Sequence, residues 1–273
     1  MLSAKLRDTS SMHDAQKDPE GSPLAGTWPL WNALYPLRER REGYGFHIAV
    51  LFFVGFLGLA GYHSTLLYNN ARDLTAWNPE SAWDTAVPAM PWTVYIYLTL
   101  YFYFPIPAFL ADRSDRGCRE MAILGQGMLL LFALSCSVFM ISPAEVTVRL
   151  QMEELMPMMS PALESIFSII YDVDRAWNSW PSLHVSESLL VVLFVQRWTE
   201  IRAEEFPRRK LWMGAFWIAW VLLSLSIITT KQHFIWDMVT GGLLGWALWK
   251  LYILPRLDRR LRSEHQVSVA TSS

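Results

Sequence analysis

The sequence predicts an all-α polytopic membrane protein with six transmembrane helices and both termini in the cytoplasm. Three observations support this fold class. Apolar residues make up 52% of the 273 residues, and 14 Trp and 14 Phe are among them. Six apolar windows are long enough to cross a bilayer, and nearly all Lys and Arg residues fall on one side of these windows.

The apolar windows define the expected spans, because a helix needs about 20 residues to cross the hydrocarbon core. We expect these spans at residues 46–66, 92–111, 121–142, 183–199, 211–229 and 234–254. The fourth window is the shortest and contains Ser186, Glu187 and Ser188 near its start. These polar side chains should therefore face the protein interior or an aqueous cleft.

The basic residues set the expected orientation of the spans. Of the 23 Lys and Arg residues, all but four fall on the side of the two termini. The four on the other side are Arg72, Arg149, Arg175 and Lys231. The positive-inside rule then places the termini in the cytoplasm, and it places the start of the fourth span and the loop before the sixth on the outer side.

Composition changes along the chain predict its organisation. We expect a cytoplasmic tail with an interfacial anchor at 1–44, a six-span membrane domain at 45–255 and a second cytoplasmic tail at 256–273. The anchor rests on Trp28, Trp31 and Tyr35, which lie close to basic residues. The outer segment 143–180 combines Met and Ile with acids, which is typical of interfacial helices, although a plain connector is the alternative. The polar ends, 1–22 and 263–273, are expected to be disordered.

Charge and cysteine content exclude several classes of protein. The formal net charge is -2, and the basic residues form no reading face, so a nucleic-acid partner is not expected. The two cysteines, Cys118 and Cys136, provide neither a disulfide framework nor a cysteine metal site. The polar N-terminal stretch lacks the apolar core and cleavage site of a secretory signal.

A histidine and an aspartate are four residues apart at the start of the sixth span, in "TTKQHFIWDMVTGG". At this spacing His233 and Asp237 lie on one face of a helix. A carboxylate that accepts the N–H of one ring nitrogen fixes the tautomer and leaves the other nitrogen free to attack. His233 is therefore a candidate nucleophile.

A second histidine lies at the start of the fourth span, in "WNSWPSLHV". Ser182 follows Pro181 and occupies the position of a helix N-cap, so the first backbone N–H groups of the span point outward and attract an anion. His184 in the first turn would lie beside a phosphate bound there and would protonate a departing alkoxide.

Together, "PSLH" and the H-x-x-x-D pattern about fifty residues later resemble the type-2 phosphatidic acid phosphatase superfamily, a six-helix membrane fold. The resemblance covers residues 143–242 and includes Asp174 and Asn178 ahead of "PSLH". It implies that His233 forms a phosphohistidine, that His184 protonates the leaving group and that Asp237 orients the nucleophile. It also implies a lipid phosphate or phospholipid substrate, with no metal and no cofactor.

The chain departs from the family pattern at two places. Ile227 stands six residues before His233, where the best-known phosphatases have Arg, and a K-x6-R-P element is absent. Arg149 and Lys231 are the nearest substitutes for these cations. Without these two elements, the pattern is more similar to the branch of inositol phosphorylceramide synthases and sphingomyelin synthases, which transfer a phospho-headgroup between lipids. Hydrolysis and transfer share the first half-reaction, so the triad does not separate them.

These residues also have simpler interpretations that involve no catalysis. A single histidine near the end of a span is usually an interfacial or packing residue, and Glu187 is either a substrate-binding or proton-handling residue or a buried polar partner. Two His and one Asp are enough ligands for zinc, but we expect no metal. Three glycines of the sixth span are more typical of close helix packing than of phosphate binding, namely Gly241, Gly242 and Gly245.

We therefore expect a lipid phosphatase or phosphotransferase in a bacterial plasma (inner) membrane, with its active site on the extracytoplasmic face. The expected substrate-binding residues are Ser182, Arg149, Lys231, Asn178 and Glu187. Either water or a lipid alcohol would accept the phosphoryl group, and the lipid and the oligomeric state stay open. A non-catalytic lipid-binding or lipid-moving protein on the same scaffold is the alternative from another class.

Overall fold

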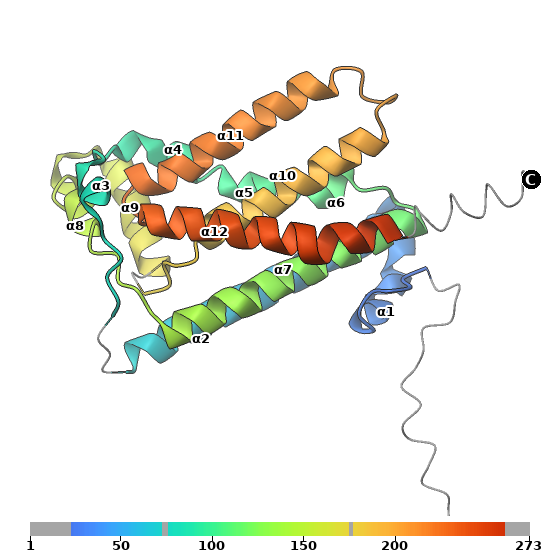
Figure 1. Ribbon diagram of the computed structural model, residues 1–273, viewed down its shortest axis with the longest axis horizontal. Helices are drawn as coiled ribbons and strands as arrows, with labels where there is room; N and C mark the ends of the chain where they lie inside the picture. Colours follow the sequence, from blue (N-terminus) through green and yellow to red (C-terminus); the bar gives the residue numbers. More distant parts are fainter. Residues whose placement is uncertain (1–22, 73–75, 175–176, 260–273) are drawn as a thin grey trace, which may run out of the picture.

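The computed structural model describes residues 23–72, 76–174 and 177–259, and this part of the chain is built from helices and loops (Figure 1). It contains no β-strand, and extended segments meet only in isolated bridges of Ala144 with Trp77 and with Asn178. The predicted all-α class is confirmed. Residues 1–22 and 260–273 of the predicted tails, and the predicted outer residue Arg175, lie outside the described residues.

Five long helices run along the long axis of the molecule (Figure 1). They are α2 (Gly45–Asn70), α7 (Asp115–Ile141), α10 (Leu183–Ile201), α11 (Arg209–Thr229) and α12 (Ile235–Leu248), which continues through a π-helical turn, η6 (Trp249–Ile253). Helix α2 packs against α7, whereas α10 packs against α7, α11 and α12. Helix α10 is therefore the centre of the bundle.

Shorter helices occupy the connections. At the N-terminal end are α1 (Leu30–Leu34), η2 (Tyr35–Glu39) and η3 (Arg41–Gly43). Between α2 and α7 are α3 (Ala82–Ala86), η4 (Pro91–Thr93), α4 (Val94–Tyr97), α5 (Leu100–Tyr103) and α6 (Ile106–Leu110). The segment 143–180 contains α8 (Arg149–Glu153), η5 (Met156–Met158) and α9 (Pro161–Val173), so it is largely helical, and the interfacial position of these helices stays a prediction.

Within the described residues, three helices are long and apolar enough to cross a membrane, namely α2, α7 and α11. They fall on the first, third and fifth expected windows. The fourth window is α10, whose polar residues are buried inside the bundle, and the sixth is divided between α12 and η6. The number of six spans and the sides of the termini stay predictions.

The second expected window, 92–111, is not one continuous helix. The structure breaks it into α4, α5 and α6, with turns at Leu98–Thr99 and Phe104–Pro105. Pro105 and Pro107 have no backbone N–H and cannot continue a helical ladder. The Thr99 hydroxyl bonds the Ile96 carbonyl oxygen at 2.6 Å, which competes with the backbone of the first turn.

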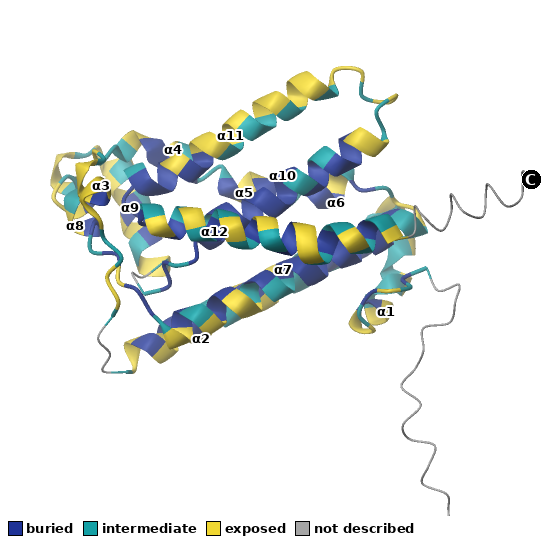
Figure 2. Ribbon diagram, viewed as in Figure 1, coloured by how far each residue is buried: buried dark blue, intermediate teal, exposed yellow. Residues whose placement is uncertain are grey.

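The distribution of burial agrees with a bundle surrounded by lipid (Figure 2). Nearly the whole of α10 is buried, including Glu187 and Arg197. By contrast, large apolar side chains point outward from α2, α11 and η6, for example Phe56, Ile218 and Leu251. An apolar exposed surface of this extent is typical of contact with a membrane.

Two glycines of α12 let it approach α10 at backbone distance. A Cβ atom at Gly241 would lie 2.5 Å from the Ser182 carbonyl oxygen, and one at Gly245 would lie 2.9 Å from the Ser186 carbonyl oxygen. A Cβ at Gly242 would have Val185 Cγ1 as its nearest neighbour, at 3.9 Å. The packing role predicted for Gly241 and Gly245 is thus confirmed, and Gly242 lies in ordinary contact.

We predict that Gly241→Ala destabilises the protein, because its Cβ can be accommodated only if the α12 backbone moves away from α10. Overpacking of this kind costs about 1–3 kcal/mol. The matched control is Gly242→Ala, which should change the free energy of unfolding by less than about 0.5 kcal/mol. Thermal unfolding of the purified variants tests this, and equal stability of the two would contradict the close approach.

Candidate active site

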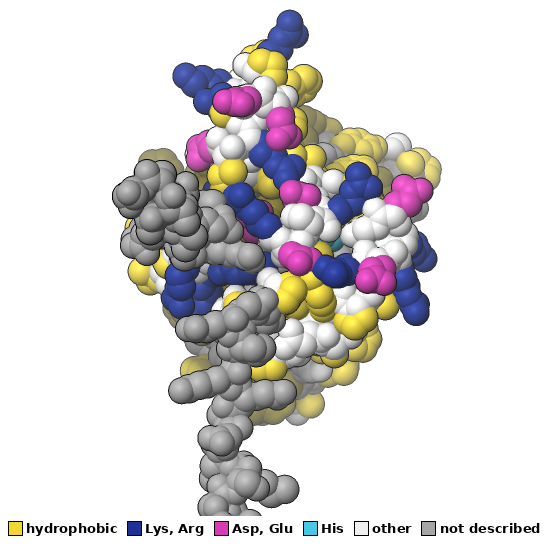
Figure 3. Space-filling view, turned by 90° about the vertical axis from the view of Figure 1, so that its right-hand side faces the viewer, with side chains coloured by type: hydrophobic (Ala, Val, Ile, Leu, Met, Phe, Trp, Pro, Cys, Tyr) yellow, Lys and Arg dark blue, Asp and Glu magenta, His cyan; other side chains and the backbone are white. Residues whose placement is uncertain are grey.

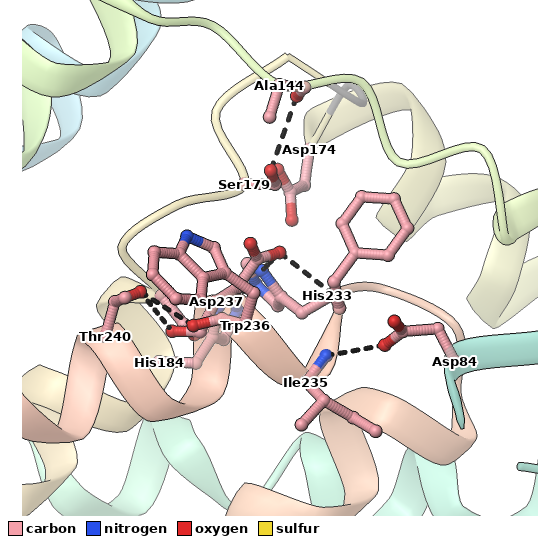
Figure 4. A network of polar contacts seen from close by, with 12 residues as sticks. Asp84, Ala144, Asp174, Ser179, His184, His233, Ile235, Trp236, Asp237 and Thr240 are labelled. Carbon is pink, nitrogen blue, oxygen red and sulfur yellow. Dashed lines mark hydrogen bonds and ion pairs between the residues drawn. The ribbon is translucent and has the colours of Figure 1, made fainter. Parts of the chain in front are cut away.

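The two predicted histidines and the aspartate meet at one end of the bundle (Figure 4). His184 lies in the first turn of α10, His233 lies between α11 and α12, and Asp237 lies in the first turn of α12. His233 Nε2 is 3.1 Å from His184 Nδ1, and His233 Nδ1 is 3.3 Å from Asp237 Oδ2. The structure therefore brings together all three residues that sequence reasoning assigned to catalysis.

Hydrogen bonds from backbone N–H groups to two carboxylates hold the turn that carries His233. The Asp237 carboxylate, which is fully buried, also accepts the Phe234 N–H at 2.9 Å and so closes the first turn of α12. The next N–H, of Ile235, donates to Asp84 Oδ1 at 2.7 Å. Asp84, in the distant short helix α3, thus acts as a cap for α12, since it satisfies one of the free N–H groups of the helix start.

A tyrosine extends the pair of histidines. The Tyr97 hydroxyl lies 2.7 Å from His184 Nε2, and the Tyr97 side chain is buried. With Asp237 ionised and both rings neutral, Asp237 accepts from His233 Nδ1, so His233 Nε2 carries a lone pair. His184 Nδ1 then donates to His233 Nε2, and Tyr97 donates to His184 Nε2. Each hydrogen bond in this row thus has one donor and one acceptor, and all three bonds are donated in the direction from Tyr97 to Asp237.

Ser182 is the N-cap residue of α10, as the sequence predicts, but its side chain makes no capping bond. Its backbone N–H donates to the Asp237 carbonyl oxygen at 3.0 Å, which ties the starts of α10 and α12 together. The Ser182 hydroxyl is buried and has no hydrogen-bond partner among the described residues.

Two of the predicted substrate-binding residues, Arg149 and Asn178, lie in the segment 143–180 and make different contacts there. Arg149 is buried and donates to the Asp174 carbonyl oxygen at 2.5 Å, while its guanidinium lies 3.6 Å from the Asp174 carboxylate. The same carboxylate accepts the Tyr62 hydroxyl. Asn178 donates to the Tyr62 carbonyl oxygen at 3.1 Å and to Thr65 Oγ1 at 2.8 Å, and so joins the outer segment to the end of α2.

Lys231 is fully buried and points away from the histidine pair toward the loop that contains α3. Its ammonium group donates to the carbonyl oxygens of Asp84 at 2.7 Å and Val87 at 2.6 Å. Burial lowers the pKa of this ammonium group. The structure thus gives Lys231 two protein acceptors and ties it to the loop whose Asp84 caps α12.

A cavity of about 610 Å³ lies beside His184. His184, Glu187 and Asp174 belong to its lining, and most of the other lining residues are apolar side chains of α2, α5 and α7. Along α2 the lining runs from Val50 to His63, which is about 20 Å at 1.5 Å per residue. The cavity therefore has the length and character that a lipid chain requires.

Sequence reasoning missed two residues that contact the triad. Tyr97 falls in a broken apolar segment and Asp84 in the short helix α3, and neither belongs to a motif. Their contacts join positions 87 and 151 residues apart, respectively, so local spacing gives no signal for them. Among the described residues, no group of three or more His, Cys, Asp and Glu side chains is arranged to hold a metal ion.

Comparison with known proteins agrees with this geometry. Residues 127–260 match the family model of the PAP2 superfamily, and this region contains His184, His233 and Asp237. This region of the protein belongs to the PAP2 superfamily. No curated protein and no solved structure gives a significant match. Members of the PAP2 superfamily are typically phosphatases or phosphotransferases that act on lipid phosphates at membranes.

Replacing Tyr97 tests the row of hydrogen bonds. We predict that Tyr97→Phe slows turnover about fivefold, because a lost hydrogen bond of about 1 kcal/mol leaves His184 free to adopt the wrong tautomer or orientation. The control is Tyr95→Phe on the same short helix, whose side chain is exposed. Turnover of Tyr97→Phe equal to that of the wild type, in a substrate assay of the kind described below, would show that the hydroxyl is dispensable.

Proposed function

We propose that the protein is a lipid phosphatase or phosphotransferase of a bacterial plasma membrane, which cleaves a lipid phosphoester or pyrophosphate on the extracytoplasmic side through a phosphohistidine at His233. The observation that carries this proposal is the meeting of His184 and His233, the latter held by Asp237, at one end of a long apolar cavity.

The first half-reaction uses the orientation of the two rings. His233 Nε2 attacks phosphorus, so an N–P bond forms while the P–O bond to the lipid breaks. His184 acts as the acid in its doubly protonated form, in which Nε2–H donates to the Tyr97 hydroxyl oxygen; its Nδ1 proton passes to the leaving oxygen, and a neutral ring remains. Asp237 stabilises the charge on the His233 ring because its carboxylate accepts a hydrogen bond from Nδ1–H, in a buried setting where the interaction is strong.

The second half-reaction reverses these roles. His184, now without its Nδ1 proton, takes a proton from water or from a lipid alcohol, whose oxygen attacks phosphorus and breaks the N–P bond. The N–H groups at the start of α10 would hold the phosphoryl oxygens near Ser182. Arg149 would contribute a positive charge from the outer segment, whereas Lys231 supports the site by fixing the loop of Asp84.

The distribution of charge supports the outer location of the site. The end of the molecule opposite to the histidines carries many Lys and Arg side chains, interspersed with acids (Figure 3). Arg38, Arg116 and Arg202 belong to this end, where they pair with Asp115, Glu120 and Asp112. Under the positive-inside rule this end faces the cytoplasm, and the histidines then face outward.

We predict that His233→Ala abolishes phosphate release from lipid phosphates, because no other side chain of the described site is placed to replace the nucleophile. His184→Ala should lower turnover by at least about a hundredfold, as expected on loss of a general acid. Release of phosphate from a panel of lipid phosphates by the purified protein is the measurement, and thermal unfolding checks that each variant is folded. Equal activity of all three proteins would favour the lipid-binding alternative.

Hydrolysis and transfer are separated by adding an acceptor. If the protein is a phosphotransferase, an added diacylglycerol or ceramide should become a new phospholipid at the expense of free phosphate, because the acceptor hydroxyl competes with water for the same phosphohistidine. Mass spectrometry of the lipid products measures this competition. Free phosphate as the sole product at every acceptor concentration would leave phosphatase activity alone.

A further inference from the structure

Glu187 stands out among the polar residues of α10, because its carboxyl group has no protein partner. The hydroxyl groups of the neighbouring serines donate hydrogen bonds to carbonyl oxygens one turn earlier in the chain. The Ser186 hydroxyl donates to the Ser182 carbonyl oxygen at 2.9 Å, and the Ser188 hydroxyl donates to the His184 carbonyl oxygen at 2.5 Å. In the described part of the chain, Glu187 makes no hydrogen bond and no ion pair, although only 4% of its surface is exposed.

An unpartnered carboxyl group in this setting is costly. A polar group taken out of water without a hydrogen bond loses several kcal/mol in general, and buried polar groups in proteins are nearly always paired. A leucine at this position would pack against the same apolar neighbours without that cost. Such a group is therefore expected to have a partner that the protein itself does not supply.

The position of Glu187 in the cavity lining indicates where this partner must lie. Glu187 lines the cavity together with His184, and the two residues are three apart on the same face of α10. Helix α10 begins at the site and runs toward the opposite end of the molecule, so Glu187 lies about 4.5 Å farther along the cavity than His184. Beyond Glu187 the lining of α10 and α7 is apolar, with Val191, Leu124 and Met121.

This distance corresponds to a definite part of a lipid. With phosphorus at the histidines, the group that reaches Glu187 is attached to the carbons next to the phosphate oxygen. Lipids built on glycerol or on a sphingoid base have a hydroxyl, amide or ester there, all of which form hydrogen bonds with a carboxyl group. Polyisoprenyl phosphates have only hydrocarbon at this place and would leave Glu187 unpaired.

We propose that Glu187 is a specificity residue that binds the polar backbone of a glycerol- or sphingoid-based lipid and thereby discriminates against polyisoprenyl phosphates. This inference rests on the proposed function, since it places the phosphate at His184 and His233. The discrimination follows from the general rule that a buried hydrogen-bonding group rejects a ligand that cannot pair with it.

The test compares two substrates in three proteins. The substrates are ceramide 1-phosphate, which has an amide and a hydroxyl near phosphorus, and a polyisoprenyl monophosphate of similar length. The wild type should have at least about a tenfold higher kcat/KM for ceramide 1-phosphate. Glu187→Leu should remove most of this preference by lowering kcat/KM for ceramide 1-phosphate alone, whereas Glu187→Gln, which still forms hydrogen bonds, should retain it.

Two results would overturn the inference: a wild type that prefers the polyisoprenyl substrate, or a Glu187→Leu variant in which both substrates lose activity equally. The wild-type ratio decides the matter even if Glu187→Leu does not fold. Failure of the proposed function is a different result, because no substrate would then release phosphate. In that case thermal stabilisation of the wild type and of Glu187→Gln by ceramide 1-phosphate, against the polyisoprenyl lipid, still tests whether Glu187 binds a polar lipid backbone.

Discussion

The close approach of α10 and α12 is the constraint on which the active site depends. Each of the two helices carries part of the triad, and their backbones touch where Gly241 and Gly245 have no side chain. The hydrogen bond from the Ser182 N–H to the Asp237 carbonyl oxygen then fixes the two helix starts against each other. In a membrane, where small residues permit such contacts and few other forces hold helices together, this packing sets the distance between the imidazoles.

A second set of buried contacts holds the His233 turn from the opposite side. The carbonyl oxygens of Asp84 and Val87 accept the Lys231 ammonium group, and the Asp84 carboxylate caps α12 at Ile235. The segment between α2 and α4 thereby binds the chain at Lys231 and at Ile235, on either side of His233. A nucleophile must be held within a fraction of an ångström of its attack position, and this double attachment provides such precision without a direct bond to the ring.

Sequence patterns predict those parts of the site that depend on local geometry. His233 and Asp237 are one helical turn apart, and Ser182 and His184 follow a proline at a helix start, so their relation was readable from spacing alone. Tyr97 and Asp84 contact the same groups from a distant part of the chain, and only the fold brings them there. The same distinction applies to the fold itself. The apolar windows predicted where helices run, but not that the window at 92–111 breaks near Pro105 and places Tyr97 against His184.

The hydrogen bond between the histidines also limits when the site can react. In the row from Tyr97 to Asp237, the lone pair on His233 Nε2, which attacks phosphorus in the proposed mechanism, is occupied by the N–H of His184. A phosphoryl group can enter only if this bond breaks, and the N–H that is released then needs a new acceptor. The leaving oxygen of the substrate is such an acceptor. In the proposed mechanism, binding of a phosphate therefore frees His233 Nε2 and at the same time turns the His184 N–H toward the leaving oxygen. In the resting protein the two histidines are hydrogen-bonded to each other instead of to water.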